Sequence, residues 1–94
     1  MSEDRLETAI HKGARAEALL ASDVFNEAVT GLQAQLMERW KIATDAQERE
    51  RIWHCVNLTE QLRQAIVTVA NNGKLAKREL AALTTGRAKR FGIV

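Results

Sequence analysis

Apolar side chains recur three or four positions apart along most of this 94-residue chain, and this spacing limits the fold more than any other feature. Such spacing lines one face of an α-helix, whereas a strand would place its apolar side chains at alternate positions. The chain also contains no proline, the residue that breaks helix interiors most strongly. The sequence therefore predicts an all-α protein.

Within this all-α class, the spacing predicts an antiparallel helical hairpin with an N-terminal helix and a short C-terminal helix. A chain of this length fits one domain and buries only a modest fraction of its surface. We expect a single helical domain over residues 1–86 and a basic C-terminal tail over 87–94. The expected helices cover residues 3–20, 23–43, 45–72 and 74–83.

Residues that favour helix ends define these bounds. Ser22 and Asp23 are good N-cap residues for the second helix. Thr44 and Gln47 match a capping box at the start of the third. The third should end at 71–73, since asparagine and glycine tolerate the left-handed conformation of a C-cap. Gly13 lies inside the first helix and costs about 1 kcal/mol relative to alanine, so we expect that helix to depend on docking.

The two central helices should pack through their apolar stripes across a short turn near Thr44. On the third helix the stripe is predicted to follow Ile52, Cys55, Thr59, Leu62, Ile66 and Val69, which places Cys55 in the core. The tryptophans are predicted to be core residues, with a partner anchor as the alternative for one of them. The predicted hairpin core comprises Phe25, Leu32, Leu36, Trp40, Ile52, Trp53, Val56, Leu62 and Ile66.

The net charge of +2 is unevenly distributed. Residues 1–73 carry 8 Lys/Arg against 11 Asp/Glu, whereas residues 74–94 carry 6 against 1. A basic end on an acidic body favours contact with an anionic partner, either nucleic acid or an acidic protein surface. The candidate contact residues are Lys74, Lys77, Arg78, Arg87, Lys89, Arg90 and Phe91, although basic tails also serve solubility.

Recognisable catalytic and metal-binding patterns are missing from the sequence. His11 and His54 are far apart, and His54 and Cys55 point about 100° apart on a helix, so they do not converge on one ion. The chain has no glycine-rich phosphate loop and no nucleophile elbow. We expect no enzymatic activity, no cofactor and no bound metal.

The single cysteine, the absence of an apolar leader after Met1 and the lack of a long apolar run favour an intracellular protein without a membrane partner. The expected location is therefore the cytoplasm.

Several stretches of the sequence resemble those of a known group of proteins. These stretches are residues 14–20, Phe25 with Ala28 and Leu32, Trp40, residues 49–53 and residues 73–76. Over about residues 14–76 the chain resembles small helical proteins of tailed bacteriophages and prophages. Such proteins are commonly encoded near head and DNA-packaging genes. The resemblance implies a part in virion assembly or packaging, in the host cell cytoplasm or the virion, and it implies no functional residue.

These observations give one leading hypothesis and two alternatives. The leading one is a non-enzymatic assembly protein that forms a homo-oligomer and contacts a phage or host protein. The first alternative is a DNA-binding module of the small packaging subunit type, which uses the basic C-terminal segment. The second is a small inhibitor or regulator that docks a helix into a host protein.

Overall fold

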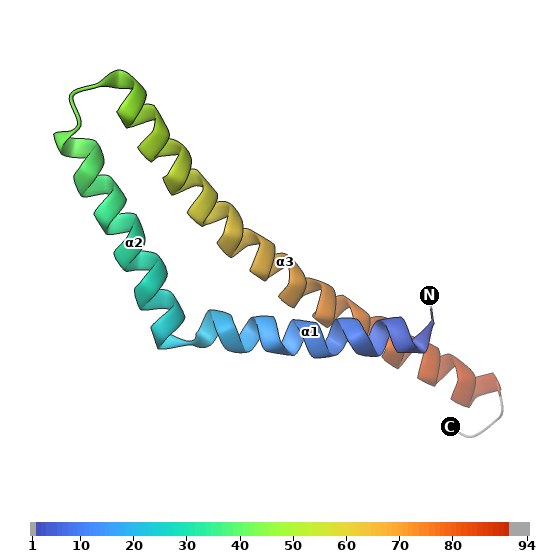
Figure 1. Cartoon of the computed structure of the whole chain (residues 1–94). Coiled ribbons are helices and arrows are strands. Elements are labelled where there is room, and N and C mark those ends of the chain that lie inside the picture. The colour runs from blue at the N-terminus through green and yellow to red at the C-terminus, as the bar shows by residue number, and fades with distance from the viewer. Residues whose placement is uncertain (1, 91–94) are drawn as a thin grey trace. The chain divides into compact units, whose positions relative to one another are not determined.

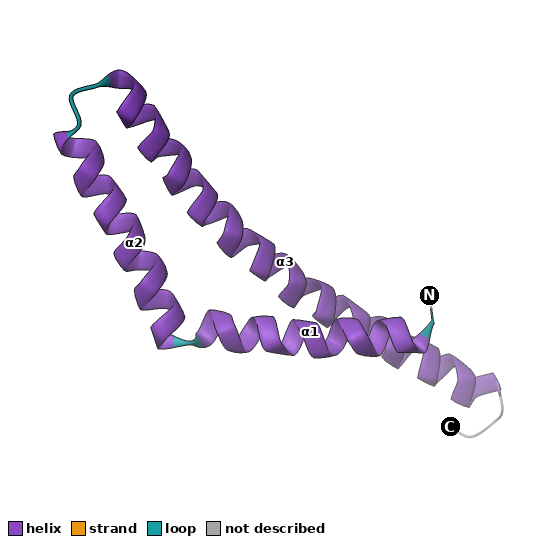
Figure 2. Ribbon diagram, viewed as in Figure 1, coloured by secondary structure: helices purple, strands orange, loops and turns teal. Residues whose placement is uncertain are grey.

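The described part of the chain forms three helices and is all-α, as the sequence predicts. The structure, a computed structural model, describes residues 2–90. Helix α1 spans Glu3–Ala21, α2 spans Asp23–Ile42 and α3 spans Ala46–Arg90 (Figures 1 and 2). No strand occurs among the described residues, and none of their helices is long and apolar enough to cross a membrane.

Helix α3 is much longer than predicted, because two expected helix ends do not occur. The helix continues through residues 71–73 and again through 84–86, so the predicted short fourth helix is its C-terminal part. The predicted tail is helical in its backbone up to Arg90, while Phe91 lies outside the described residues. Gly73 therefore does not act as the predicted C-cap, and it instead lies against Gly13 of α1.

The starts of α2 and α3 are fixed by side-chain caps. Ser22 is the N-cap of α2, and the backbone N–H of Phe25 donates to its Oγ at 3.3 Å. At the start of α3 the backbone N–H of Gln47 donates to Oδ1 of Asp45 at 3.2 Å. Asp45 thus supplies the capping oxygen that we expected from Thr44, which shifts the cap by one residue.

The chain divides into two compact units. The central unit comprises Leu19–Ile66, and the terminal unit combines the residues up to Ala18 with those from Val67 onward. Because α3 passes through both units, its two parts have different neighbours. Each unit is therefore described on its own.

The terminal unit is built on close contact between α1 and the C-terminal part of α3. A Cβ added to Gly13 would lie 2.6 Å from the Cα of Gly73, so the two helix backbones touch at these residues. Lys74 Nζ lies 3.6 Å from Glu17 Oε1 beside this contact. Small side chains such as Ala16, Ala70 and Ala76 are buried, together with Leu6. Gly73 is thus a contact residue inside a helix.

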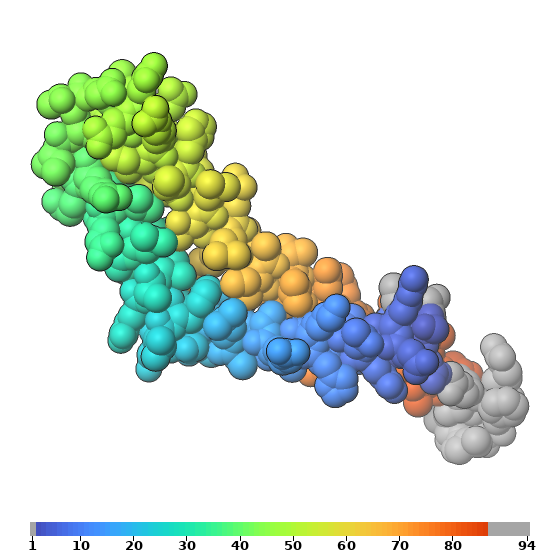
Figure 3. Space-filling view, in the orientation of Figure 1, coloured from blue at the N-terminus to red at the C-terminus, as the bar shows by residue number. Residues whose placement is uncertain are grey.

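In the central unit α2 folds back along the first part of α3 through the turn at residues 43–45 (Figure 1). The core near the turn consists of Leu36, Ala43 and Ile52, with Trp40 and Val56 packed against it. In the space-filling view, side chains close the space between the two ribbons at this turn end (Figure 3). These contacts hold α2 and the first part of α3 side by side and antiparallel.

Candidate protein interface

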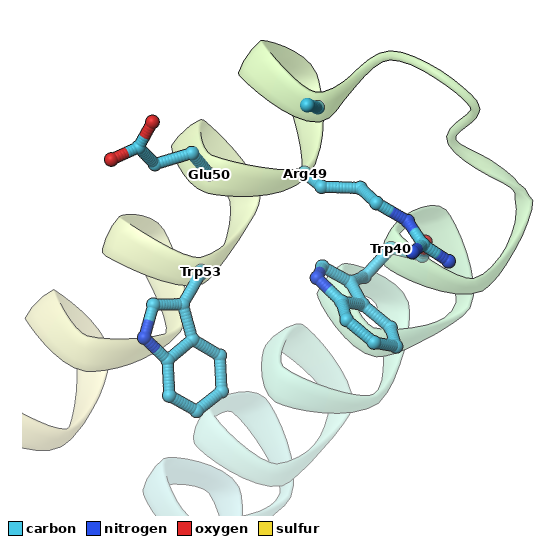
Figure 4. A pocket seen from close by; sticks show the side chains of 5 residues that line it. Trp40, Arg49, Glu50 and Trp53 are labelled. Carbon is cyan, nitrogen blue, oxygen red and sulfur yellow. The ribbon is translucent and has the colours of Figure 1, made fainter.

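A shallow hollow lies at the turn end of the central unit, between α2 and α3. It has a volume of about 440 Å³ and is lined by Trp40, Ala46, Arg49, Glu50 and Trp53. Figure 4 shows both indole rings bordering this hollow, with Trp53 coming from α3 and Trp40 from α2. An apolar hollow of this kind can accept an apolar side chain of another protein.

Arg49 covers one face of Trp40. Its guanidinium carbon lies 4.3 Å from the ring centroid, and its Nε donates to the backbone O of Trp40 at 3.3 Å. A cation above an indole face is attracted by the negative potential of the ring. Trp40 is consequently half-buried, whereas Trp53 is 51% exposed. The prediction that Trp53 belongs to the core was wrong, and its exposure agrees with the alternative of a partner anchor.

The α3 stripe that faces α2 differs from the predicted stripe by one position at several points. In the central unit the buried or half-buried residues include Ile52, Val56, Thr59, Arg63 and Ile66, spaced alternately four and three apart. Cys55 is exposed, and Leu62 is 59% exposed, because each precedes one of these contact residues on the helix. The predicted burial of Cys55 and Leu62 was therefore wrong.

Val69, which was predicted to continue the same stripe, is also outside the core. It lies in the terminal unit and is 39% exposed, whereas its neighbour Ala70 is buried. The one-residue displacement therefore persists along α3.

Helix α2 repeats the same displacement. Phe25 is half-buried and Val29 and Leu36 are buried, whereas Leu32 is 47% exposed, so its predicted core position was also wrong. Val24, Ala28 and Leu32 each come one residue before a half-buried or buried residue of α2. Of the remaining predicted core residues, Leu36 and Ile52 are buried, and Trp40, Val56 and Ile66 are half-buried.

These displaced residues share one side of the helix pair. Two antiparallel helices are related by a local twofold axis perpendicular to their common plane, so residues with the same offset from the contact stripe lie on the same side. We call this set the apolar face. It consists of Val24, Ala28 and Leu32 of α2 and Cys55, Leu58, Leu62 and Ala65 of α3. All seven are exposed.

The opposite side of the same helix pair is mainly polar. Within the central unit it is formed by the residues that come one position after the contact stripes, and among them only Ala34, Met37 and Trp53 are apolar. The polar members are Asn26, Thr30, Lys41, Asn57, Glu60 and Gln64. The two sides of the central unit therefore differ in chemistry, and the apolar face is the stronger candidate for a protein interface.

The predicted basic contact residues are only partly brought together. Lys74 forms an ion pair with Glu17, while Lys77 and Arg78 are exposed on α3. The side chains of Arg87, Lys89 and Arg90 and all of Phe91 lie outside the described part of the chain. The side chains of only three of the seven predicted contact residues, Lys74, Lys77 and Arg78, are therefore described.

The described side chains form no cluster of three or more potential metal ligands. His54 Nε2 lies 3.8 Å from Glu50 Oε1 on the surface of α3, one helical turn away. An exposed pair at this spacing is typical of a solvated helix face.

No family model matches the chain, and no curated protein or solved structure gives a significant match to it.

Proposed function

We propose that this chain is a non-enzymatic assembly protein that acts by self-association and by contact with other proteins. The observation that carries this proposal is the apolar face of the central unit. Leu58 and Leu62 are 61% and 59% exposed there, and the charged residues on the same side, Arg39 and Arg51, lie toward the turn, beyond the seven residues of the face. Exposed apolar residues gathered on one side of a helix pair are characteristic of protein interfaces.

The resemblance to small helical proteins of tailed bacteriophages supports virion assembly as the setting of this activity. In that setting the protein acts in the host cell cytoplasm or in the virion, and its partners are copies of itself and a phage or host protein. The hollow beside Trp53 provides a second apolar contact site for such a partner.

Static light scattering over a range of protein concentrations tests self-association. The expected molar mass exceeds the chain mass of 10.5 kDa at high micromolar concentration and falls toward it on dilution. A molar mass equal to that of one chain throughout this range would contradict the proposal.

The alternative function, DNA binding, is favoured by the exposed Lys77 and Arg78 near the basic end of α3. Each phosphate contact releases counterions, so the affinity for duplex DNA should fall steeply with salt concentration. Replacing both residues by alanine should then reduce the slope of log affinity against log salt by about 2. Fluorescence anisotropy with a labelled duplex measures this slope, and an absence of binding at low salt would dismiss the alternative.

A further inference from the structure

The hollow at the turn end of the central unit is suited to a side chain of another protein. We call it the tryptophan hollow, and it is lined by Trp40, Ala46, Arg49, Glu50 and Trp53. A small molecule bound to a protein usually has about 70–90% of its surface buried, which a shallow hollow does not provide. A side chain that projects from a larger partner needs less enclosure, because the rest of the partner lies on the surrounding helices.

Trp53 supplies the exposed apolar surface of the tryptophan hollow. Its side chain is 51% exposed, although Ile52 is buried and Val56 is half-buried against α2. Figure 4 shows its ring at the border of the hollow, on the opposite side from the Trp40 ring. A tryptophan buries a large apolar area on binding and is enriched among the residues that contribute most to binding energy. An apolar side chain of a partner would therefore pack against Trp53.

Two charged residues line the tryptophan hollow, and their charged groups point in different directions. The Glu50 carboxylate is directed away from both indole rings, and its Oε1 lies 3.8 Å from His54 Nε2 (Figure 4). The Arg49 guanidinium instead lies next to the Trp40 ring, with its carbon 4.3 Å from the ring centroid. The charge that stays beside the rings is therefore positive.

The Arg49 guanidinium is held in place, but its donors are not all used. The ring contact and the hydrogen bond from Nε to the backbone O of Trp40 fix its position. The N–H donors on its two terminal nitrogens have no partner among residues 2–90, and no carboxylate there forms an ion pair with it. A guanidinium matches the two oxygens of a carboxylate, and one that is already fixed loses less freedom on binding.

From the exposed Trp53, the fixed Arg49 and the direction of the Glu50 carboxylate, we propose that the tryptophan hollow binds an acidic segment of another protein. In this segment a large apolar side chain lies next to an aspartate or glutamate. The apolar side chain packs against Trp53, and the carboxylate accepts hydrogen bonds from Arg49. This inference rests on the proposed function, since it gives the chemistry of a protein partner, but it concerns a different surface from the apolar face.

A nuclear magnetic resonance titration with two peptides tests the proposal. The probes are acetyl-Ala-Phe-Glu-Ala-amide and acetyl-Ala-Phe-Gln-Ala-amide, which differ only in the carboxylate. The chain has two tryptophans, so nitrogen-15-labelled protein gives two indole N–H signals, and Trp53→Phe assigns them. The glutamate peptide should bind about fivefold more tightly at low salt, which is the upper end for a partly exposed ion pair. This ratio should fall toward one at high salt, because salt screens the attraction.

Three variants separate the contributions of the ring and the charge. Trp53→Ala should abolish binding of both peptides, so the remaining Trp40 signal should not shift. Arg49→Gln should make the two affinities equal, while the Trp53 signal still shifts with both peptides. Arg51→Gln is the matched control, because Arg51 is an exposed arginine of α3 that does not line the hollow. This control should keep the fivefold preference, and far-UV circular dichroism should show wild-type helix content in all three variants.

Each of the other outcomes contradicts the proposal. Equal affinity of the wild-type protein for the two peptides would overturn it, as would a preference that persists at high salt or in Arg49→Gln. The salt dependence is measured on the wild-type chain, so it decides the matter even if Arg49→Gln loses helix content. Loss of self-association in Trp53→Ala would show that a second copy occupies the hollow, which also overturns the proposal. Light scattering tests self-association without the peptides, so a failure of the proposed function is recognised separately.

Discussion

Replacing Gly13 by alanine tests the contact between α1 and α3 in the terminal unit. The new Cβ would lie 2.6 Å from the Cα of Gly73 and 3.3 Å from the backbone O of Val69. Both of these atoms belong to the backbone of α3, so no side chain can rotate out of the way. The two helices must move apart to accommodate the methyl group.

The expected effect is the difference between two opposing contributions. Alanine is favoured over glycine inside a helix by about 1 kcal/mol. Forcing an extra carbon into a tight contact typically costs about 1 to 3 kcal/mol. Because the contact at Gly13 involves backbone on both sides, the upper part of that range applies. We therefore expect Gly13→Ala to lower the free energy of unfolding by about 1 to 2 kcal/mol.

The matched control is Gly31→Ala, in the interior of α2. A Cβ at Gly31 meets no atom within 4 Å, so only the helix preference changes. This variant should raise the free energy of unfolding by about 1 kcal/mol. Chemical denaturation followed by circular dichroism measures both values, at one protein concentration because the proposed self-association would make stability depend on concentration.

The sign of the change in unfolding free energy for Gly13→Ala tests whether the backbones of α1 and α3 are in close contact at this residue. If Gly13→Ala stabilises the protein as much as Gly31→Ala does, the helices are not in backbone contact at this point. The same substitution at Gly73, where a Cβ would lie 2.7 Å from the Cα of Gly13, should be destabilising as well.

Three further predictions concern the central unit. Ser22→Ala removes the cap that accepts from the N–H of Phe25 and should cost about 1 kcal/mol in urea denaturation, whereas no loss would show that Ser22 Oγ does not cap α2. Arg49→Ala removes both the contact with the Trp40 ring and the hydrogen bond to its backbone, and it should also cost about 1 kcal/mol by the same assay. Trp53→Phe should lower the acrylamide quenching of the tryptophan fluorescence that remains, measured in dilute protein, because Trp53 is 51% exposed whereas Arg49 covers one face of Trp40. Unchanged quenching would show that the two tryptophans are equally accessible.

The sequence was sufficient to predict the helical class and the position of the first two helices. The spacing of apolar residues and the absence of proline determine the class, and Ser22 marks the boundary between α1 and α2. These are local properties, because each depends on residues within one or two helical turns.

The continuation of α3 could not be predicted in the same way. Asparagine and glycine at residues 71–73 favour a helix end locally, but Gly73 packs against Gly13, which is sixty residues away in the sequence. The sequence alone does not distinguish a glycine that ends a helix from a glycine that allows two helices to touch. Only the tertiary contact distinguishes them.

The candidate interface was missed because two adjacent stripes were treated as one. Cys55 and Leu62 are apolar, so hydrophobicity alone assigned them to the core. The contact stripe instead contains Thr59 and Arg63, which are half-buried although they are polar, and the Thr59 hydroxyl donates to the backbone O of Cys55 at 2.9 Å. The sequence places an apolar residue one position before several of the contact residues, but the contact residues themselves are identified only by the packing of α2 on α3.

The reactivity of the Cys55 thiol, measured as a function of protein concentration, tests the central claim most directly. Cys55 is exposed in the single chain and lies in the apolar face, so a maleimide reagent should label it rapidly in dilute protein. As light scattering shows the molar mass rising, the labelling rate should fall in parallel, because a second copy covers the thiol. A labelling rate that stays constant while the molar mass doubles would show that the chains associate through a different surface.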